Sequence, residues 1–259
     1  MEKVTLQRVE GLAIISIDDP STKNAIDAKF ATELIEVCET INRDLSIGAA
    51  VIRGENDTFC SGANTSAWEG DFDPASSEGY ALMDVIYRSF FVFGNLTVPT
   101  IAAVRGSAVG AGLNLALSAD LRVMSSTARL IPGFMRLGLH PGGGFFTLAR
   151  RTMNRDQIAA LGLFGESTTG SEAQRIGLAY EAVDDGEVDD RAIGLAKKAA
   201  ADPELSRLSV RSFRIETSTP GMSWEAALEF ERASQMRSQR RRVERNGRYT
   251  NQVLDGGSV

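Results

Sequence analysis

Residues 98–123 have the sequence VPTIAAVRGSAVGAGLNLALSADLRV. Residues 100–104 form a short apolar run with β-branched members, which predicts a buried strand. The Gly-rich residues 106–112 predict a tight turn, and residues 112–119 predict a helix of small side chains. Residues 121–124 predict a further strand. Strand, turn, helix and strand in this order are typical of an α/β protein, in which helices cover a largely parallel sheet.

The N-terminal part of the chain shows a similar alternation. Residues 4–9 alternate between apolar and polar, Glu10-Gly11 predicts a turn, and Leu12–Ile17 predicts the second strand of a hairpin. Apolar residues at helical spacing predict a helix over 27–43, and a strand is expected at 49–53. We therefore predict an α/β core built from repeated strand and helix units.

The C-terminal part has a different pattern. Strand signals stop after about residue 190, and helices are predicted over 191–201, 203–216 and 223–245. We therefore expect a core at 1–190 that holds the site, followed by a helical oligomerisation region at 191–259. Between the two strand and helix units, the acidic, Gly- and Ser-containing segment 69–78 predicts a mobile surface loop.

Composition excludes several classes of protein. Of the 259 residues, 43% are hydrophobic and 24% are charged, which excludes a disordered chain, a collagen and a coiled coil. We expect no membrane span, because Arg105 interrupts the longest apolar stretch. The N-terminus lacks the features of a signal peptide, and with two cysteines no disulfide framework is expected. A cytoplasmic location is the resulting expectation.

The net charge of −6 argues against a general nucleic-acid binder. Charge is nevertheless uneven, because residues 232–248 contain seven arginines and one acid, Glu244. Two interpretations stay open for this segment. It is either a solvated helix face that pairs with acids elsewhere, or an anion patch that contacts ligand phosphates.

Two loops have the composition of a ligand site. Residues 59–64 (FCSGAN) and residues 106–112 (GSAVGAG) each follow a predicted strand and are small enough for a ligand to reach the backbone. The second loop also opens a helix, whose first NH groups have no intrahelical acceptor. Two such NH groups directed at one oxygen would form an oxyanion hole. Tight packing alone also explains either loop, and the glycine spacing does not match a dinucleotide-binding turn.

The order of several motifs resembles the enoyl-CoA hydratase/isomerase (crotonase) superfamily over nearly all of residues 4–215. The motifs that carry the resemblance are KNAIDAKF (23–30), AAVIRGENDTFCSGAN (49–64), VPTIAAVRGSAVGAGLNLALSADLRV (98–123), LGLHPGGG (137–144) and GSEAQRIGLAYEAV (170–183). The resemblance implies a spiral of ββα units with a C-terminal helical region that forms trimers, often as a dimer of trimers.

The resemblance also implies a ligand and a set of contacts. Members of the superfamily act on acyl-CoA thioesters, so coenzyme A would enter as part of the substrate and no permanently bound cofactor is expected. By motif position, the backbone NH groups of Ala63 and Ala111 would bind the thioester oxygen. Lys23, Ala25 and Ser61, with Ala63, would line the CoA moiety. Fixed NH dipoles in a dry site are suited to stabilise an enolate oxyanion.

The sequence departs from the superfamily at two positions. Hydratases of this kind use two glutamates, and the matching positions are Asn114 in GAGLNLAL and Phe134 in LIPGFMRLGLHPGGG. Addition of water by paired acid and base groups needs side chains that exchange protons near neutral pH, which an amide and a phenyl ring do not do. The sequence therefore argues against hydration by the standard route and favours isomerisation or another enolate reaction.

Other residues are candidate replacements for the missing carboxylates. His140 is the only histidine and has a side chain suited to proton transfer, although a lone histidine also serves in structure. The acids of the 69–78 loop offer an alternative base, whereas Cys60 and Ser61 have no partner base at a diagnostic spacing. No metal site is indicated. A non-catalytic acyl-CoA binder is the main alternative to an enzyme, and a purely structural module leaves the loop pattern unexplained.

Overall fold

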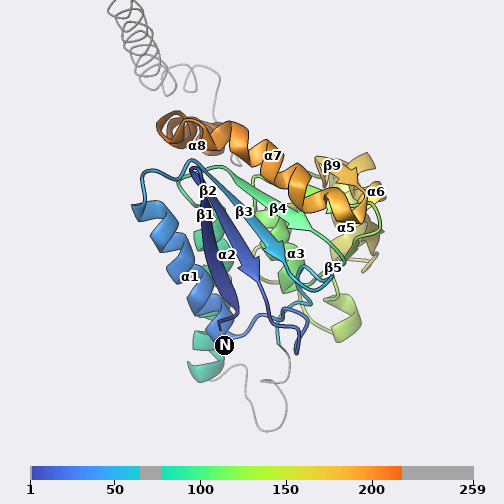
Figure 1. Cartoon of the computed structure of the whole chain (residues 1–259). Coiled ribbons are helices and arrows are strands. Elements are labelled where there is room, and N and C mark those ends of the chain that lie inside the picture. Colours follow the sequence, from blue (N-terminus) through green and yellow to red (C-terminus); the bar gives the residue numbers. More distant parts are fainter. Residues whose placement is uncertain (1, 65–76, 218–259) are drawn as a thin grey trace, which may run out of the picture. The chain divides into compact units, whose positions relative to one another are not determined.

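The computed structural model describes residues 2–64 and 77–217, and its strands and helices alternate along the chain (Figure 1). The strands are β1 (Val4–Val9), β2 (Leu12–Ile17), β3 (Ala49–Gly54), β4 (Thr100–Val104), β5 (Ser107–Val109), β6 (Leu121–Ser125), β7 (Arg129–Ile131), β8 (Thr168–Thr169) and β9 (Glu181–Val183). The helices are α1 (Ala28–Arg43), α2 (Ser77–Gly94), α3 (Ala111–Ser118), α4 (Phe145–Ala149), α5 (Arg155–Gly162), α6 (Gly170–Arg175), α7 (Val188–Ala200) and α8 (Pro203–Thr217), with the 3-10 turns η2 (Met135–Leu137) and η3 (Asp185–Glu187). The predicted α/β class is confirmed.

Two sheets organise these elements. The larger has the strand order β1-β2-β3-β4-β6-β9, in which only the β1–β2 pair is antiparallel. The smaller has the order β5-β7-β8. The predicted hairpin is confirmed, because Val4 pairs with Ile17 and Val9 with Leu12. Its turn residues Glu10 and Gly11 both have positive φ, the backbone twist that suits a two-residue hairpin turn.

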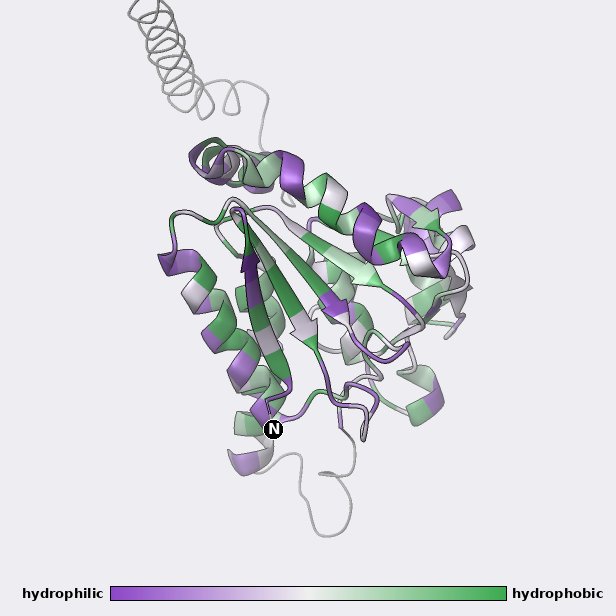
Figure 2. Cartoon of the chain, in the orientation of Figure 1, coloured by the Kyte–Doolittle hydropathy of each residue, from purple (hydrophilic) through white to green (hydrophobic). Residues whose placement is uncertain are grey.

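The strands β2, β3 and β4 of the larger sheet are buried on both faces. In β2, Ala13 and Ile15 belong to the core on the α1, α2 and α3 side, whereas Leu12 and Ile14 belong to the core under α7. A strand covered on both faces needs apolar residues at successive positions, which explains the continuous apolar run. Figure 2 shows these strands as mainly hydrophobic and shows α7 lying across one face of the sheet.

The chain divides into two units, residues 1–206 and 207–259, and residues 207–217 continue α8. The expected boundary after residue 190 falls inside α7, whose Val188, Ala192 and Ala196 are buried against the sheet. The oligomerisation role expected for residues 191–259 stays a prediction.

Two sequence expectations fall largely outside the described residues. The helix predicted over 223–245 lies outside them, as does most of the loop expected at 69–78. The last two residues of that loop, Ser77 and Glu78, instead begin α2, and an acid in the first turn of a helix is favoured by the helix dipole. Within the described ranges, no helix is long and apolar enough to cross a membrane.

Candidate functional site

A cavity of about 800 Å³ lies where the two Gly-containing loops meet α2 and the chain that follows β7. The described residues that line it come from five segments: Thr22 and Ala25; then Ser61, Gly62, Ala63 and Asn64; then Met83, Ile86 and Tyr87; then Val109, Gly110, Ala111 and Asn114; then Pro132, Gly133, Phe134, Arg136, Leu137, Leu139, His140 and Gly142. All the site residues predicted from the sequence line this cavity except Lys23.

The two loops are held together by backbone contacts. Cys60 N donates to Ser107 O and Val109 N donates to Cys60 O, each at 3.0 Å. On the first turn of α3, Gly112 packs against Cys60 so closely that a Cβ there would lie 2.5 Å from Cys60 O. Gly62 faces the second loop, because a Cβ on it would lie 3.8 Å from Ala111 N. The relative position of Ala63 and Ala111 is therefore set by direct backbone packing.

Ala63 and Ala111 each present a backbone NH without an acceptor among the described residues. The bridge between Ile26 and Ala63 uses Ile26 N to Gly62 O and Asn64 N to Ile26 O, both at 2.8 Å, and leaves the Ala63 NH out. Ala111 is the first residue of α3, where NH groups have no intrahelical acceptor. Both alanines line the cavity. Each NH group is therefore free to donate to a ligand in the cavity.

The segment from Asp19 to Ile26 forms the rim next to these loops. Lys23 and Asn24 both have left-handed backbone, at φ 54° and 60°. Asn24 is buried, and its Nδ2 donates to Thr58 O at 2.7 Å and to Glu55 O at 3.1 Å. Ser61 N donates to Lys23 O at 3.0 Å. The structure therefore brings the Lys23 backbone to Ser61, while the exposed Lys23 side chain does not line the cavity.

A charged cluster anchors the start of this rim. Lys3 Nζ contacts Asp19 Oδ2 at 2.8 Å and Asp27 Oδ2 at 2.6 Å. Hydrogen bonds from Lys3 and Ser21 hold the pKa of Asp19 well below its ordinary value. Ionised Asp19 therefore stabilises the folded state above the ordinary pKa of aspartate, and this stabilisation is lost as the pH falls toward the lower folded pKa.

Replacement of Lys3 by methionine should lower the free energy of unfolding by about 2 kcal/mol at pH 7, between the values for exposed and fully buried ion pairs. The difference in the free energy of unfolding between Lys3→Met and wild type should shrink as the pH falls below about 4. Ionised Asp19 then contributes less and less to the stability of the wild type. Urea unfolding between pH 3 and pH 7 measures both effects. Lys29→Met is the matched control, because Lys29 pairs with Glu33 on an exposed helix face and should cost about 0.5 kcal/mol or less. An equal loss of unfolding free energy in the two variants would contradict the anchoring role of Lys3.

Asn114 is buried in α3, and its amide supports the loop that closes the cavity. Nδ2 donates to Gly142 O at 2.8 Å, while Oδ1 is buried without a partner in the described part of the chain. A Cβ on Gly143 would lie 2.6 Å from Asn114 Nδ2, and one on Gly142 would lie 2.3 Å from the Tyr87 hydroxyl oxygen. The loop carbonyl therefore requires a donor at position 114, which an amide supplies and a carboxylate does not.

Phe134 and His140 lie on the segment after β7. The Phe134 ring packs edge-on against Phe145, with ring centroids 5.4 Å apart. The His140 ring is tilted toward Phe146 at 6.5 Å. Both residues line the cavity, and no Asp or Glu does among the described residues. Any proton transfer by the described lining side chains therefore falls to His140 or Tyr87.

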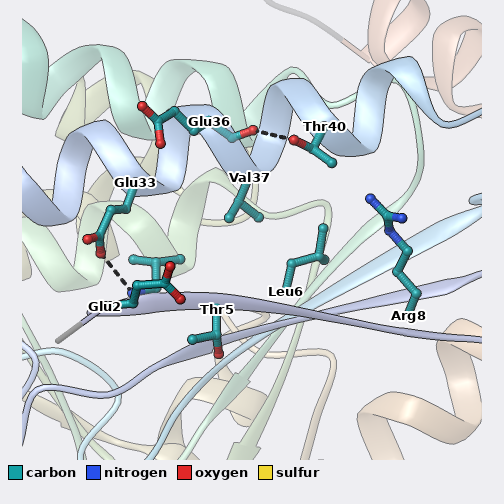
Figure 3. A pocket seen from close by; sticks show the side chains of 9 residues that line it. Glu2, Thr5, Leu6, Arg8, Glu33, Glu36, Val37 and Thr40 are labelled. Carbon is teal, nitrogen blue, oxygen red and sulfur yellow. Dashed lines mark hydrogen bonds between the residues drawn. The ribbon is translucent and has the colours of Figure 1, made fainter.

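A second cavity of about 520 Å³ lies between β1 and α1 (Figure 3). Glu33 stands on its wall and already accepts hydrogen bonds from Lys3 N and Val4 N. None of the residues predicted for the site lines it. The first cavity is therefore the candidate site.

Comparison with known proteins agrees with this geometry. The family model described as enoyl-CoA hydratase/isomerase matches residues 7–250. The chain belongs to the enoyl-CoA hydratase/isomerase family. It is 35% identical over 221 residues to the probable enoyl-CoA hydratase echA14 of Mycobacterium tuberculosis (strain CDC 1551 / Oshkosh), covering 85% of this chain and 84% of the relative. It is 31% identical over 216 residues to a probable enoyl-CoA hydratase of Rhodobacter capsulatus, covering 82% and 80%.

The fold is also that of the enoyl-CoA hydratase/isomerase family. A crystal structure described as a putative enoyl-CoA hydratase/isomerase from Mycobacterium abscessus superposes with a TM-score of 0.81 at 26% identity, covering 91% of each chain. The expected crotonase-like architecture is confirmed.

Several residues that line the cavity were not predicted from the sequence. Met83, Ile86 and Tyr87 come from α2, which was not predicted as a helix. Their spacing, continued by Phe90, follows helical periodicity and could have revealed the element. Arg136, in η2, had no comparable signal.

Both cysteines of this family member are buried, and burial raises the pKa of each thiol to about 12. The reactive thiolate should amount to on the order of one molecule in 10⁵ at pH 7. We expect iodoacetamide to leave Cys38 and Cys60 unmodified in the native protein and to alkylate both after denaturation, as read by mass spectrometry. Rapid labelling of Cys60 in the native protein would contradict this prediction, and Cys60 would then be a candidate nucleophile.

Proposed function

We propose that this protein binds acyl-CoA thioesters and stabilises the enolate of the bound acyl group. The observation that supports this most directly is the pair of unsatisfied NH groups of Ala63 and Ala111 on the wall of one cavity. Coenzyme A enters as part of the substrate. Ala25 and Ser61 contact its near end in this proposal, and the Lys23 backbone supports them.

The proposed reaction moves a proton at the carbon next to the thioester carbonyl. A base removes that proton, the electrons of the C–H bond form the C=C bond of the enolate, and the negative charge develops on the oxygen held by the two NH groups. Return of the proton to the same carbon gives exchange, and return two carbons farther along an enoyl chain moves the double bond. His140 is the proposed base, because it is the only imidazole in the chain and it lines the cavity. No co-reactant is consumed.

Hydration by paired carboxylates is not part of the proposal. Asn114 and Phe134 occupy the two positions at which the resemblance places glutamates, and the Asn114 amide is engaged with Gly142 O. A second candidate function, acyl-CoA binding without turnover, is favoured by the absence of Asp and Glu from the described lining residues.

The test is mass spectrometry of a panel of enoyl-CoA thioesters incubated with the protein in D₂O. We expect deuterium incorporation or double-bond movement without addition of water, and loss of this activity in His140→Ala. Addition of water would overturn the proposed reaction. A thioester that is retained but unchanged would support the binder, and failure to retain any thioester would remove both candidates. Unchanged turnover in His140→Ala would remove His140 from the mechanism.

We also propose that the protein assembles as a trimer or a dimer of trimers in the cytoplasm. Exposed apolar side chains outside the cavity support the assembly: Met135, Leu163 and Phe164. A Cβ on Gly165 would lie 3.5 Å from Met135 Cβ, so the two parts of this set are neighbours. Exposed apolar patches mark contact surfaces. A monomer mass by light scattering at micromolar concentration would contradict the assembly.

A further inference from the structure

The cavity wall is largely apolar but carries a positive charge. Arg136 supplies the only permanent charge among the described residues that line the cavity, and no described Asp or Glu lies there to neutralise it. Around it the wall is apolar, with Phe134, Leu137 and Leu139 from the same segment. A cation in such a setting favours an anionic ligand group.

Arg136 is available for such a contact. It lies in η2, and no ion pair or hydrogen bond joins it to any residue in the ranges that the structure describes. Other arginines are already engaged, as Arg53 is with Asp189 at 3.2 Å and Arg191 with Glu181 at 2.7 Å. The Arg136 residue is exposed and lines the cavity, so a ligand can reach it.

Arg136 shares the cavity wall with the apolar side chains Phe134, Leu137 and Leu139. In the proposed function, the NH groups of Ala63 and Ala111 hold the thioester oxygen, and residues near Ala25 contact CoA. Arg136 belongs to a different segment, residues 132–142, which supplies the apolar wall that an acyl chain would contact. A guanidinium on that wall is suited to bind a group at or near the end of the acyl chain.

We propose that Arg136 selects acyl-CoA thioesters whose acyl chain carries a second carboxylate. The planar guanidinium would bind this carboxylate through two parallel hydrogen bonds, which a neutral alkyl end cannot accept. This inference rests on the proposed function, because it requires the thioester to occupy the same cavity. It adds a specificity determinant and a substrate class.

The test compares matched CoA thioesters by isothermal titration calorimetry. Dicarboxylic acyl-CoA compounds of four to eight carbons, such as adipoyl-CoA, are paired with monocarboxylic ones of equal length, such as hexanoyl-CoA. At one or more lengths, wild type should bind the dicarboxylic member at least about tenfold more tightly. Arg136→Gln should lose that preference and keep its affinity for the monocarboxylic member. Arg88→Gln, at an exposed arginine of α2 that does not line the cavity, should behave as wild type.

The outcomes separate this inference from the function on which it rests. Equal affinity for the two members at every length, with thioesters still bound, would overturn the role of Arg136 and leave the proposed function intact. Failure of every thioester to bind would overturn the proposed function itself. An equal loss of affinity for both members and for free CoA in Arg136→Gln would also overturn the inference, because Arg136 would then contact the CoA phosphates.

Discussion

Replacement of Gly112 by alanine should abolish most of the acyl-CoA-dependent activity. The new Cβ would lie 2.5 Å from Cys60 O and 2.7 Å from Cys60 Cβ, distances that require the two loops to separate. In the proposed function, this separation would keep the NH groups of Ala63 and Ala111 from binding the same thioester oxygen. Loss of one such donor costs about 10²- to 10³-fold in rate, and we expect a reduction of that size in deuterium exchange. Overpacking should also lower the free energy of unfolding by about 1–3 kcal/mol.

Gly194→Ala is the matched control for this experiment. Gly194 is an exposed residue of α7, and a Cβ there would meet nothing within 4 Å. Alanine at an open helical position should stabilise the protein by about 0.5–1 kcal/mol and leave activity unchanged. If Gly112→Ala kept wild-type exchange, the close packing of the two loops would not be what aligns the donors.

Replacement of Asn114 by aspartate should destabilise the protein at pH 7 by about 3 kcal/mol, although aspartate has nearly the same shape. The carboxylate would face Gly142 O without a donor, as an unpaired buried charge. Desolvation would raise the pKa of the new carboxyl above its unfolded value. The destabilisation should therefore be small below about pH 4, where the protonated carboxyl can donate to Gly142 O, and grow as the pH rises toward the raised pKa.

Chemical denaturation of Asn114→Asp and Asn114→Ala between pH 4 and pH 8 measures this dependence. Asn114→Ala removes the donor without adding a charge, so its loss of about 1–3 kcal/mol should not vary with pH relative to wild type. We also expect no hydratase activity in Asn114→Asp, because residue 134, where the resemblance places the second glutamate, is a phenylalanine. A pH-independent loss in the aspartate variant, equal to that in Asn114→Ala, would contradict the role assigned to the amide.

Local patterns in the sequence determined much of the fold. The hairpin, α1, β3, β4, α3 and β6 were predicted within one or two residues, because apolar periodicity and turn residues act over short stretches of chain. The start of α1 also has a local cause that was not predicted: Asp27 precedes the first turn and accepts from Phe30 N at 2.8 Å. The two Gly-containing loops were also found from the sequence, together with their order relative to the predicted strands.

Tertiary structure decided what these elements do together. The sequence shows Asn114 and Gly142, but only packing of α3 against the closing loop places the amide on a carbonyl 28 residues away. In the same way, only the folded chain leaves the Lys23 side chain outside the cavity and puts Arg136 on its wall. The physical reason is the range of the interactions. Periodicity and turn preferences depend on neighbours in sequence, whereas the direction of a side chain in a cavity depends on contacts between segments that the sequence separates.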